Sequence, residues 1–123
     1  MSLFLECCDA LSEDVEIMHN SDLALSIFNK YPMRLNNIDW TKIFYKDYED
    51  MSLLLNDFKV YVDDKVFIMP DDKDIPVLKS NLRLVVYNIY EVIALSPKLF
   101  IFNKDIVLYP LFPTYIIRVG TLI

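Results

Sequence analysis

The first eighteen residues carry apolar side chains at helical spacing. From Leu3 to Met18 these positions follow one another at steps of one, three or four, the pattern of one face of a 3.6-residue helix. The spacing predicts a helix over residues 3–18, with Cys7 and Cys8 on its buried face. The opposite face carries four carboxylates and no base to pair with them: Glu6, Asp9, Glu13 and Glu16.

Two more helical segments are expected in the first half of the chain. Asn20 or Ser21 is a suitable N-cap for a helix that ends before Pro32. Asp39 is a suitable cap for the next segment, because apolar residues keep helical spacing across residues 40–58. That spacing fits either one helix or two.

The hydrophobic period changes to two in the middle of the chain. Alternation over residues 58–62, a turn of two aspartates and the apolar run 65–69 together predict a β-hairpin. A further helix is predicted near 77–95, after a proline that suits a first helical turn. Residues 98–110 hold two apolar runs that predict a second hairpin, and residues 114–120 predict one more strand.

These elements predict an α+β fold in a single domain, residues 1–123. A helical N-terminal half would pack on an antiparallel sheet of about four or five strands, with the further helix near 77–95. The length of 123 residues suits one domain, and the 54% apolar content suits a dense core.

Glycine is almost missing from the chain. Average usage of about 7% would give roughly nine glycines, and Gly120 is the single one. Phosphate loops and dinucleotide-binding turns need several glycines so that the backbone can approach the phosphates. The sequence therefore argues against nucleotide enzymes of those types, and we expect no cofactor.

The usual catalytic and metal-binding side chains are scarce. His19 is the single histidine, and a turn between two helices explains it better than a catalytic role. Cys7 and Cys8 are adjacent, which strains a disulfide between them, and no base lies nearby to lower the pKa of either thiol. The acidic stretch 69–80 lacks the glycine and the closing glutamate of a calcium loop. We therefore expect no metal site and no enzymatic activity.

The sequence also predicts a cytoplasmic location. No apolar run reaches the roughly 18 to 20 residues needed to cross a bilayer. The N-terminal segment carries several acids and no Lys or Arg, unlike a secretory signal. Two adjacent cysteines also fit a reducing compartment better than a disulfide framework.

The net charge of −6 is distributed unevenly. Residues 1–29 hold six acids and no Lys or Arg, and residues 47–74 hold nine acids against three lysines, so each segment carries −6. Residues 30–46 and 75–123 each carry +3. The chain therefore has two acidic segments, an asymmetry that the net charge hides.

Two interpretations of the acidic segments are open. A strong charge of one sign can keep an apolar protein in solution. Alternatively, the acidic segments bind a basic protein partner, with tyrosines of the stretch FYKDYED at the centre of the interface. Nucleic acid and membrane partners are disfavoured because their phosphates would be repelled. The candidate partner-binding residues are Glu6, Asp9, Glu13, Glu16, Tyr48, Asp63, Asp64, Asp71, Asp72 and Asp74.

Three stretches give the chain the character of a known class of protein. They are the acidic segment LECCDALSEDVEIM and the partly aromatic acidic segments YKDYED and VDDKVFIMPDDKD. In this overall character the chain resembles a bacterial immunity protein of contact-dependent growth inhibition. The resemblance implies that it binds a cognate toxin domain, often a cationic nuclease. It also implies that its carboxylates stand in for phosphate and cover the toxin's active site or substrate surface.

Two other functions fit the same composition. A small carboxylate-dependent enzyme or enzyme subunit would need distant acids, such as Glu91 and Asp105, to meet in a cleft. An acidic adaptor or phosphate mimic would bind a different basic partner. The neighbouring gene would distinguish these functions best, since a large secreted protein with a basic C-terminal domain favours immunity.

Overall fold

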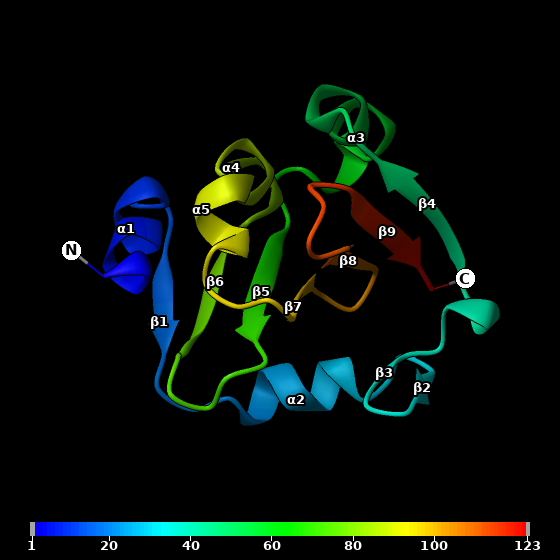
Figure 1. Cartoon of the computed structure of the whole chain (residues 1–123), viewed down its shortest axis with the longest axis horizontal. Coiled ribbons are helices and arrows are strands. Elements are labelled where there is room, and N and C mark those ends of the chain that lie inside the picture. The colour runs from blue at the N-terminus through cyan, green and yellow to red at the C-terminus, as the bar shows by residue number, and fades with distance from the viewer. Residues whose placement is uncertain (1, 123) are drawn as a thin grey trace.

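A seven-stranded antiparallel sheet forms the centre of the molecule (Figure 1). The computed structural model describes residues 2–122, and the strand order is β1-β6-β5-β7-β8-β9-β4. In that order the strands are β1 (Glu16–Met18), β6 (Val77–Asn81), β5 (Lys65–Pro70), β7 (Leu99–Phe102), β8 (Ile106–Pro110), β9 (Ile117–Thr121) and β4 (Phe44–Tyr48). A separate two-stranded sheet pairs β2 (Met33–Arg34) with β3 (Asn37–Ile38).

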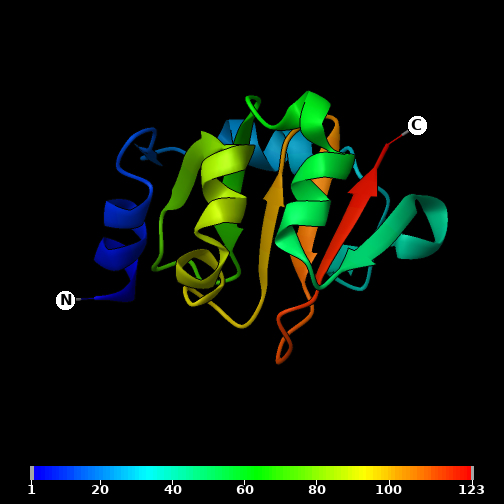
Figure 2. The same ribbon diagram turned by 90° about the horizontal axis from the view of Figure 1, so that it is seen from above.

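Helices cover both faces of the sheet. Four of them pack on one face: α1 (Leu3–Ala10), α3 (Met51–Asp57), α4 (Leu82–Tyr87) and α5 (Ile89–Ile93). Helix α2 (Asp22–Phe28) and the β2–β3 hairpin cover the other face, and Figure 2 shows the four helices in front with α2 behind. Along β7, Leu99 and Ile101 belong to the first core, and Phe100 and Phe102 belong to the second. The central strands are therefore apolar at nearly every position rather than alternating.

An aromatic cluster holds α2 against its face of the sheet. The Phe28 ring lies between Phe100 and Phe102, with ring centroids 4.7 and 5.0 Å apart. Just beyond the helix, the buried hydroxyl of Tyr31 donates a hydrogen bond of 2.6 Å to the carbonyl oxygen of Asn103. Burial also raises the pKa of Tyr31, because the charged phenolate would be desolvated there.

Several predicted elements are confirmed, as is the α+β class. Helix α2 begins and ends where the cap and proline signals predicted, and the Asn20 side chain accepts a hydrogen bond of 2.8 Å from the backbone N–H of Asp22. Strands β7 and β8 form the second predicted hairpin, and β9 is the last predicted strand. In the β7–β8 turn, Asn103 accepts backbone hydrogen bonds from Asp105 and Ile106. Strong local signals therefore predicted these elements correctly.

The predicted helix over residues 3–18 is wrong beyond Ala10. The backbone N–H of Leu11 closes α1 on the carbonyl oxygen of Cys7, and the chain then turns into β1. The acids of a longer helix would lie at the negative end of its macrodipole, whereas β1 gains a ladder with β6. Glu13 therefore lies in a turn and Glu16 on a strand.

The helix expected over the second part of residues 40–58 is confirmed as α3 (Met51–Asp57), whereas the first part is not α-helical. The Asp39 carboxylate does accept a hydrogen bond of 3.2 Å from the backbone N–H of Thr41, but it caps the short 3-10 helix η1 (Trp40–Lys42). Strand β4 follows and pairs with β9, and α3 begins after its cap at Asp50. Long-range pairing with β9 outweighs the local helical spacing here.

The two predictions that follow in the chain are also corrected. Residues Lys59–Tyr61 form the 3-10 helix η2 instead of a strand, and β5 pairs with β6 and β7. Strand β6 occupies the start of the helix predicted near 77–95. Helix α4 begins only after Asn81, whose side chain caps it, and Asn88 separates α4 from α5.

Both edges of the sheet come from the half of the chain that was expected to be helical. Strands β1 and β4 are these edges, and the sheet has seven strands rather than four or five. Strand β1 is only three residues long, too short to show a clear alternation of apolar and polar residues. The number of strands was underestimated because β1, β4 and β6 lie in segments whose apolar spacing also fits a helix.

Candidate functional site

The carboxylates of the N-terminal segment lie along the β1 edge of the sheet although their helix is shorter than expected, with Glu16 opposite Lys79 and on the other face of β1 from Ile17. Glu6 and Asp9 lie on α1, Glu13 lies in the turn after it and Glu16 lies on β1, and all four side chains are exposed. Within residues 2–122 none of them forms a salt bridge. Their charges are therefore available to a partner.

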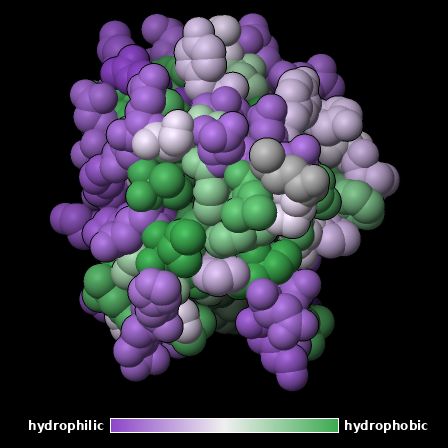
Figure 3. Space-filling model, turned by 90° about the vertical axis from the view of Figure 1, so that its left-hand side faces the viewer, coloured by the Kyte–Doolittle hydropathy of each residue, from purple (hydrophilic) through white to green (hydrophobic). Residues whose placement is uncertain are grey.

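Apolar side chains are exposed among these carboxylates. Leu3 and Leu5 of α1 are each 55% exposed, and Ile17 of β1 is 40% exposed. Figure 3 views this side of the molecule and shows apolar side chains at its centre with hydrophilic ones around them. An apolar centre with a polar rim is typical of a protein-binding patch. We define the α1–β1 surface as Leu3, Leu5, Glu6, Asp9, Glu13, Glu16 and Ile17.

Strand β1 adds an open sheet edge to this surface. It pairs with β6 on one side, with Ile17 opposite Leu78, and in the part of the chain that the structure describes no strand pairs with its other side. Backbone N–H and C=O groups on such an edge can bond to a strand of a partner.

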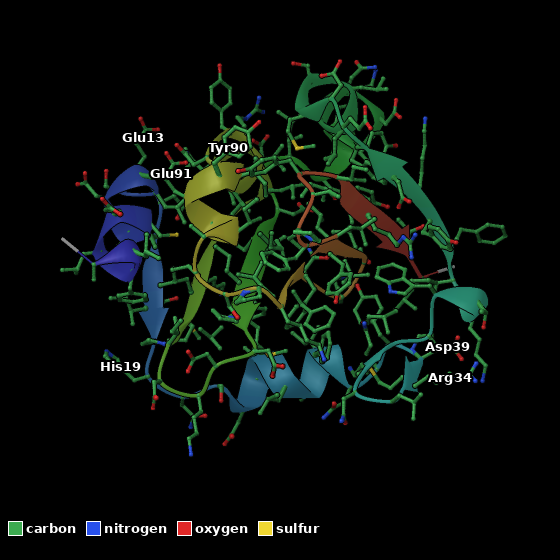
Figure 4. All side chains as sticks on the ribbon, in the orientation of Figure 1. Glu13, His19, Arg34, Asp39, Tyr90 and Glu91 are labelled. Atoms are coloured by element: carbon green, nitrogen blue, oxygen red, sulfur yellow. The ribbon has the colours of Figure 1, made fainter. Side chains whose placement is uncertain are left out.

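Helix α5 brings Tyr90 and Glu91 to the same side. Figure 4 labels both residues on α5, which packs against α1. A groove of about 180 Å³ lies between α1 and α5, and its lining includes Leu3, Glu6, Tyr90 and Glu91. Sequence reasoning did not connect Glu6 with Glu91, because only the packing of α1 on α5 brings them together.

Asp14 has a structural role in the acidic segment. Its carboxylate forms an ion pair with Lys65 and accepts a hydrogen bond of 2.8 Å from the side-chain amide of Asn81. These two donors hold the pKa of Asp14 below its usual range. The ion pair ties the α1–β1 turn to the start of β5. Asp63 and Asp64, which precede Lys65, therefore lie at the same end of the sheet as this turn.

Three other predicted residues lie at the opposite end of β5, in the turn to β6. The Asp71 carboxylate lies 3.9 Å from the ammonium of Lys98, and the Asp72 carboxylate accepts a hydrogen bond of 2.9 Å from the backbone N–H of Asp74. A groove of about 810 Å³ separates this turn from α2, and His19 also lines it. The predicted binding residues therefore fall on two separate surfaces.

Tyr48 is buried, contrary to the expectation of an exposed interface tyrosine. Its ring meets Phe58 edge to face at 5.9 Å, and its hydroxyl donates a hydrogen bond of 2.8 Å to the Asp57 carboxylate. Burial and this hydrogen bond raise the pKa of Tyr48 to about 12. Exposed aromatic side chains that sequence reasoning did not single out include Phe112 and Tyr115 in the β8–β9 turn.

The two cysteines differ in exposure. Cys7 is fully buried, and burial raises the pKa of its thiol to about 12, which leaves almost no thiolate at neutral pH. Cys8 is only half-buried, which corrects the expectation that both are buried. His19 is exposed and lies between β1 and α2 rather than between two helices.

The structure separates Glu91 from Asp105, the pair that the enzyme alternative would bring together. Tyr90, next to Glu91, contacts Tyr115 in the β8–β9 turn, with ring centroids 4.9 Å apart. Asp105 lies in the β7–β8 turn, at the opposite end of these antiparallel strands.

Within residues 2–122 no group of three or more His, Cys, Asp or Glu side chains is placed to hold a metal ion. The same range contains no helix with the length and apolar character needed to cross a bilayer.

Charges at the far edge of the sheet are paired within the fold. The guanidinium of Arg118 on β9 donates two hydrogen bonds to the Asp47 carboxylate of β4, at 2.8 and 3.1 Å. It also lies 4.3 Å from the ring centroid of Tyr45. The carboxylate raises the pKa of Arg118. Asp47 is therefore neutralised locally, unlike the acids of the α1–β1 surface.

The exposed acidic surface with its apolar centre is typical of a small protein that acts by binding another protein. Among known families, the one described as CdiI immunity protein, EcoliA0-like, matches residues 1–120. The chain belongs to this family and is a toxin-immunity protein of contact-dependent growth inhibition, which confirms the resemblance seen in its sequence. No curated protein matches the chain.

Proposed function

We propose that this protein binds a cognate toxin domain through the α1–β1 surface and neutralises it by covering the toxin's active site or substrate surface. The family match over residues 1–120 is the observation that carries the proposal, because an immunity protein acts against a cognate toxin. We propose further that the toxin is basic and nuclease-like, and that the two proteins meet in the cytoplasm of the protected cell.

The exposed carboxylates support a basic partner. Four acids of the α1–β1 surface have no salt bridge within residues 2–122, so their summed field extends into solvent. A field of this kind steers a cationic protein into an encounter and speeds its association. A nuclease binds phosphates with cationic groups, and carboxylates can occupy the same positions. The surface therefore suits a toxin whose own substrate is an anion.

The remaining predicted residues divide between two roles in this proposal. Asp64 extends the acidic area at the end of the sheet where the α1–β1 turn lies, while the charge of Asp63 is partly offset by the Arg83 guanidinium, 3.2 Å from its carboxylate. Asp71, Asp72 and Asp74 form a second candidate contact at the opposite end of β5. Tyr48 is left out of the proposed contact because only 3% of it is exposed.

Co-expression with the toxin tests this function directly. The C-terminal toxin domain encoded by the neighbouring gene would be induced in bacterial cells with and without this protein. We expect this protein to restore growth and to elute with the toxin domain as a one-to-one complex in gel filtration. An unrelated acidic protein of similar size and net charge is the control, and it should do neither. Continued growth arrest in cells that contain the folded protein would contradict the proposal.

A further inference from the structure

Three aromatic side chains that the fold leaves exposed lie together beside α5. Tyr90 of α5 is 63% exposed, and Phe112 and Tyr115 of the β8–β9 turn are 68% and 65% exposed. The rings of Tyr90 and Tyr115 meet edge to face with centroids 4.9 Å apart. With Pro97 and Pro113 they line an open cleft of about 210 Å³, which we call the aromatic cleft.

The aromatic cleft continues into the acidic groove between α1 and α5. Tyr90 and Ala94 line both hollows, so the tyrosine ring separates an aromatic wall from the carboxylates of Glu6 and Glu91. Neither carboxylate has a salt bridge within residues 2–122. The two hollows therefore adjoin at Tyr90 and Ala94, with aromatic rings on one side and carboxylates on the other.

The chemistry of this surface selects a cationic side chain. Lys and Arg have an apolar stem that packs on aromatic rings and a charged end that carboxylates attract. A cation within about 6 Å of a tyrosine ring gains a further electrostatic attraction. A small-molecule ligand fits less well, because the cleft is smaller than the roughly 300 Å³ at which ligand pockets begin. A second copy of this protein also fits less well, since two chains of net charge −6 repel each other.

We propose that the aromatic cleft is the central contact for the toxin and that it receives a Lys or Arg side chain of that partner. The charged end of this side chain meets Glu91 and Glu6, and its stem packs on Tyr90 and Tyr115. This inference rests on the proposed function, since it takes the toxin as the partner. Clustered tyrosines surrounded by polar groups are the composition that carries most of the binding free energy in protein interfaces.

Alanine substitutions in the cleft test the inference against the toxin domain of the neighbouring gene. Tyr90→Ala and Phe112→Ala should each raise Kd by about tenfold or more, as expected for central interface aromatics. Phe44→Ala is the matched control, because Phe44 is 72% exposed on β4 at the far edge of the sheet. It should change Kd by less than about twofold. Thermal melts of all three variants would show that the fold is intact.

A second variant keeps the inference testable if an alanine variant fails to fold. Glu91→Gln changes only the charge of an exposed side chain, and it should raise Kd several-fold and weaken the salt dependence of binding. If the wild type binds the toxin and neither Glu91→Gln nor a folded cleft variant weakens binding, the cleft inference is wrong while the proposed function stands. If the wild type does not bind, the proposed function itself fails. A concentration-dependent dimer that Phe112→Ala abolishes would overturn the inference by assigning the cleft to a second copy.

Discussion

The single glycine of the chain lies where two side chains press against strand β9. A Cβ atom on Gly120 would lie 2.6 Å from Ile43 Cδ1 and 2.9 Å from a ring carbon of Trp40. The backbone cannot move away easily, because Gly120 pairs with Tyr45 of β4 on one side and with Val107 of β8 on the other. The position therefore requires a residue without a side chain.

Replacing this glycine should destabilise the protein. We expect Gly120→Ala to lower the free energy of unfolding by about 1–3 kcal/mol, the usual cost of overpacking, as measured by urea denaturation. Ile43→Val removes the Cδ1 atom that lies nearest to the new methyl group. The double variant should therefore lose less stability than the two single losses added together. Strictly additive losses would argue against the steric explanation.

At the level of elements, Asn81 joins two parts of the fold. Its side-chain oxygen accepts a hydrogen bond of 2.9 Å from the backbone N–H of Leu84 and so caps α4. Its side-chain amide donates a hydrogen bond of 2.8 Å to the Asp14 carboxylate in the α1–β1 turn. One residue therefore fixes both the start of α4 and the turn that presents the acidic surface.

We expect Asn81→Ala to lower the free energy of unfolding by about 1–2 kcal/mol, mostly through the lost cap. The loss should depend on pH, because Asn81 helps to hold the pKa of Asp14 below its usual range. A depressed carboxyl pKa stabilises the fold above the unfolded-state pKa, and this contribution disappears as pH falls through the folded-state pKa. The difference from wild type should therefore shrink in acid. Asn56→Ala, an exposed position on α3, is the control, and an equal loss there would contradict this role.

Elements with local signals could be predicted from the sequence, and those that depend on distant pairing could not. Helix α2 has its own caps, and the β7–β8 hairpin has its own turn, so both were predicted correctly. Leu78 and Leu82 show the opposite case. They are four residues apart and both fully buried, which fits one helix, yet Leu78 lies on β6 and Leu82 begins α4. Only the pairing of β6 with β5 and β1 decides between the two structures.

On the scale of the whole molecule, the sequence indicated which acids are exposed but not how they group. The nine acids proposed as partner contacts are all exposed, since turns and polar helix faces lie at the surface. They divide into two surfaces because β5 carries the chain from one end of the sheet to the other. Asp64 directly precedes this strand and Asp71 directly follows it. The sequence did not identify Tyr90 as a binding residue, because the residues around it in the fold come from α1 and the β8–β9 turn, which are distant in the chain. Tyr48 was misjudged because a tyrosine beside acids can equally point into the core.

The two ends of β5 are far enough apart for the acids near each end to be tested separately. Strand β5 has six residues and spans roughly 20 Å at about 3.3 Å per residue. The Debye length at physiological ionic strength is about 8 Å, so charges at one end are largely screened from a partner bound at the other. A change of charge should therefore alter toxin binding only when it lies on the surface that the toxin contacts.

Two double charge reversals should show which surface the toxin contacts. Glu6→Lys with Glu13→Lys changes the α1–β1 surface, and Asp71→Lys with Asp74→Lys changes the opposite end. Each pair adds four positive charges and moves the net charge from −6 to −2, so the variants are matched in total charge. At about 0.15 M salt we expect the first pair to slow association with the toxin about tenfold and to flatten its salt dependence.

The second pair should slow association by less than about twofold, and neither pair should lower the melting temperature noticeably, because exposed charges contribute little to stability. Stopped-flow association at several salt concentrations is the measurement. Equal slowing by both pairs would mean that net charge alone steers the encounter. A larger effect from the second pair would move the contact to the end of β5 where Asp71 and Asp74 lie, and the α1–β1 surface would then serve only to keep an apolar protein in solution.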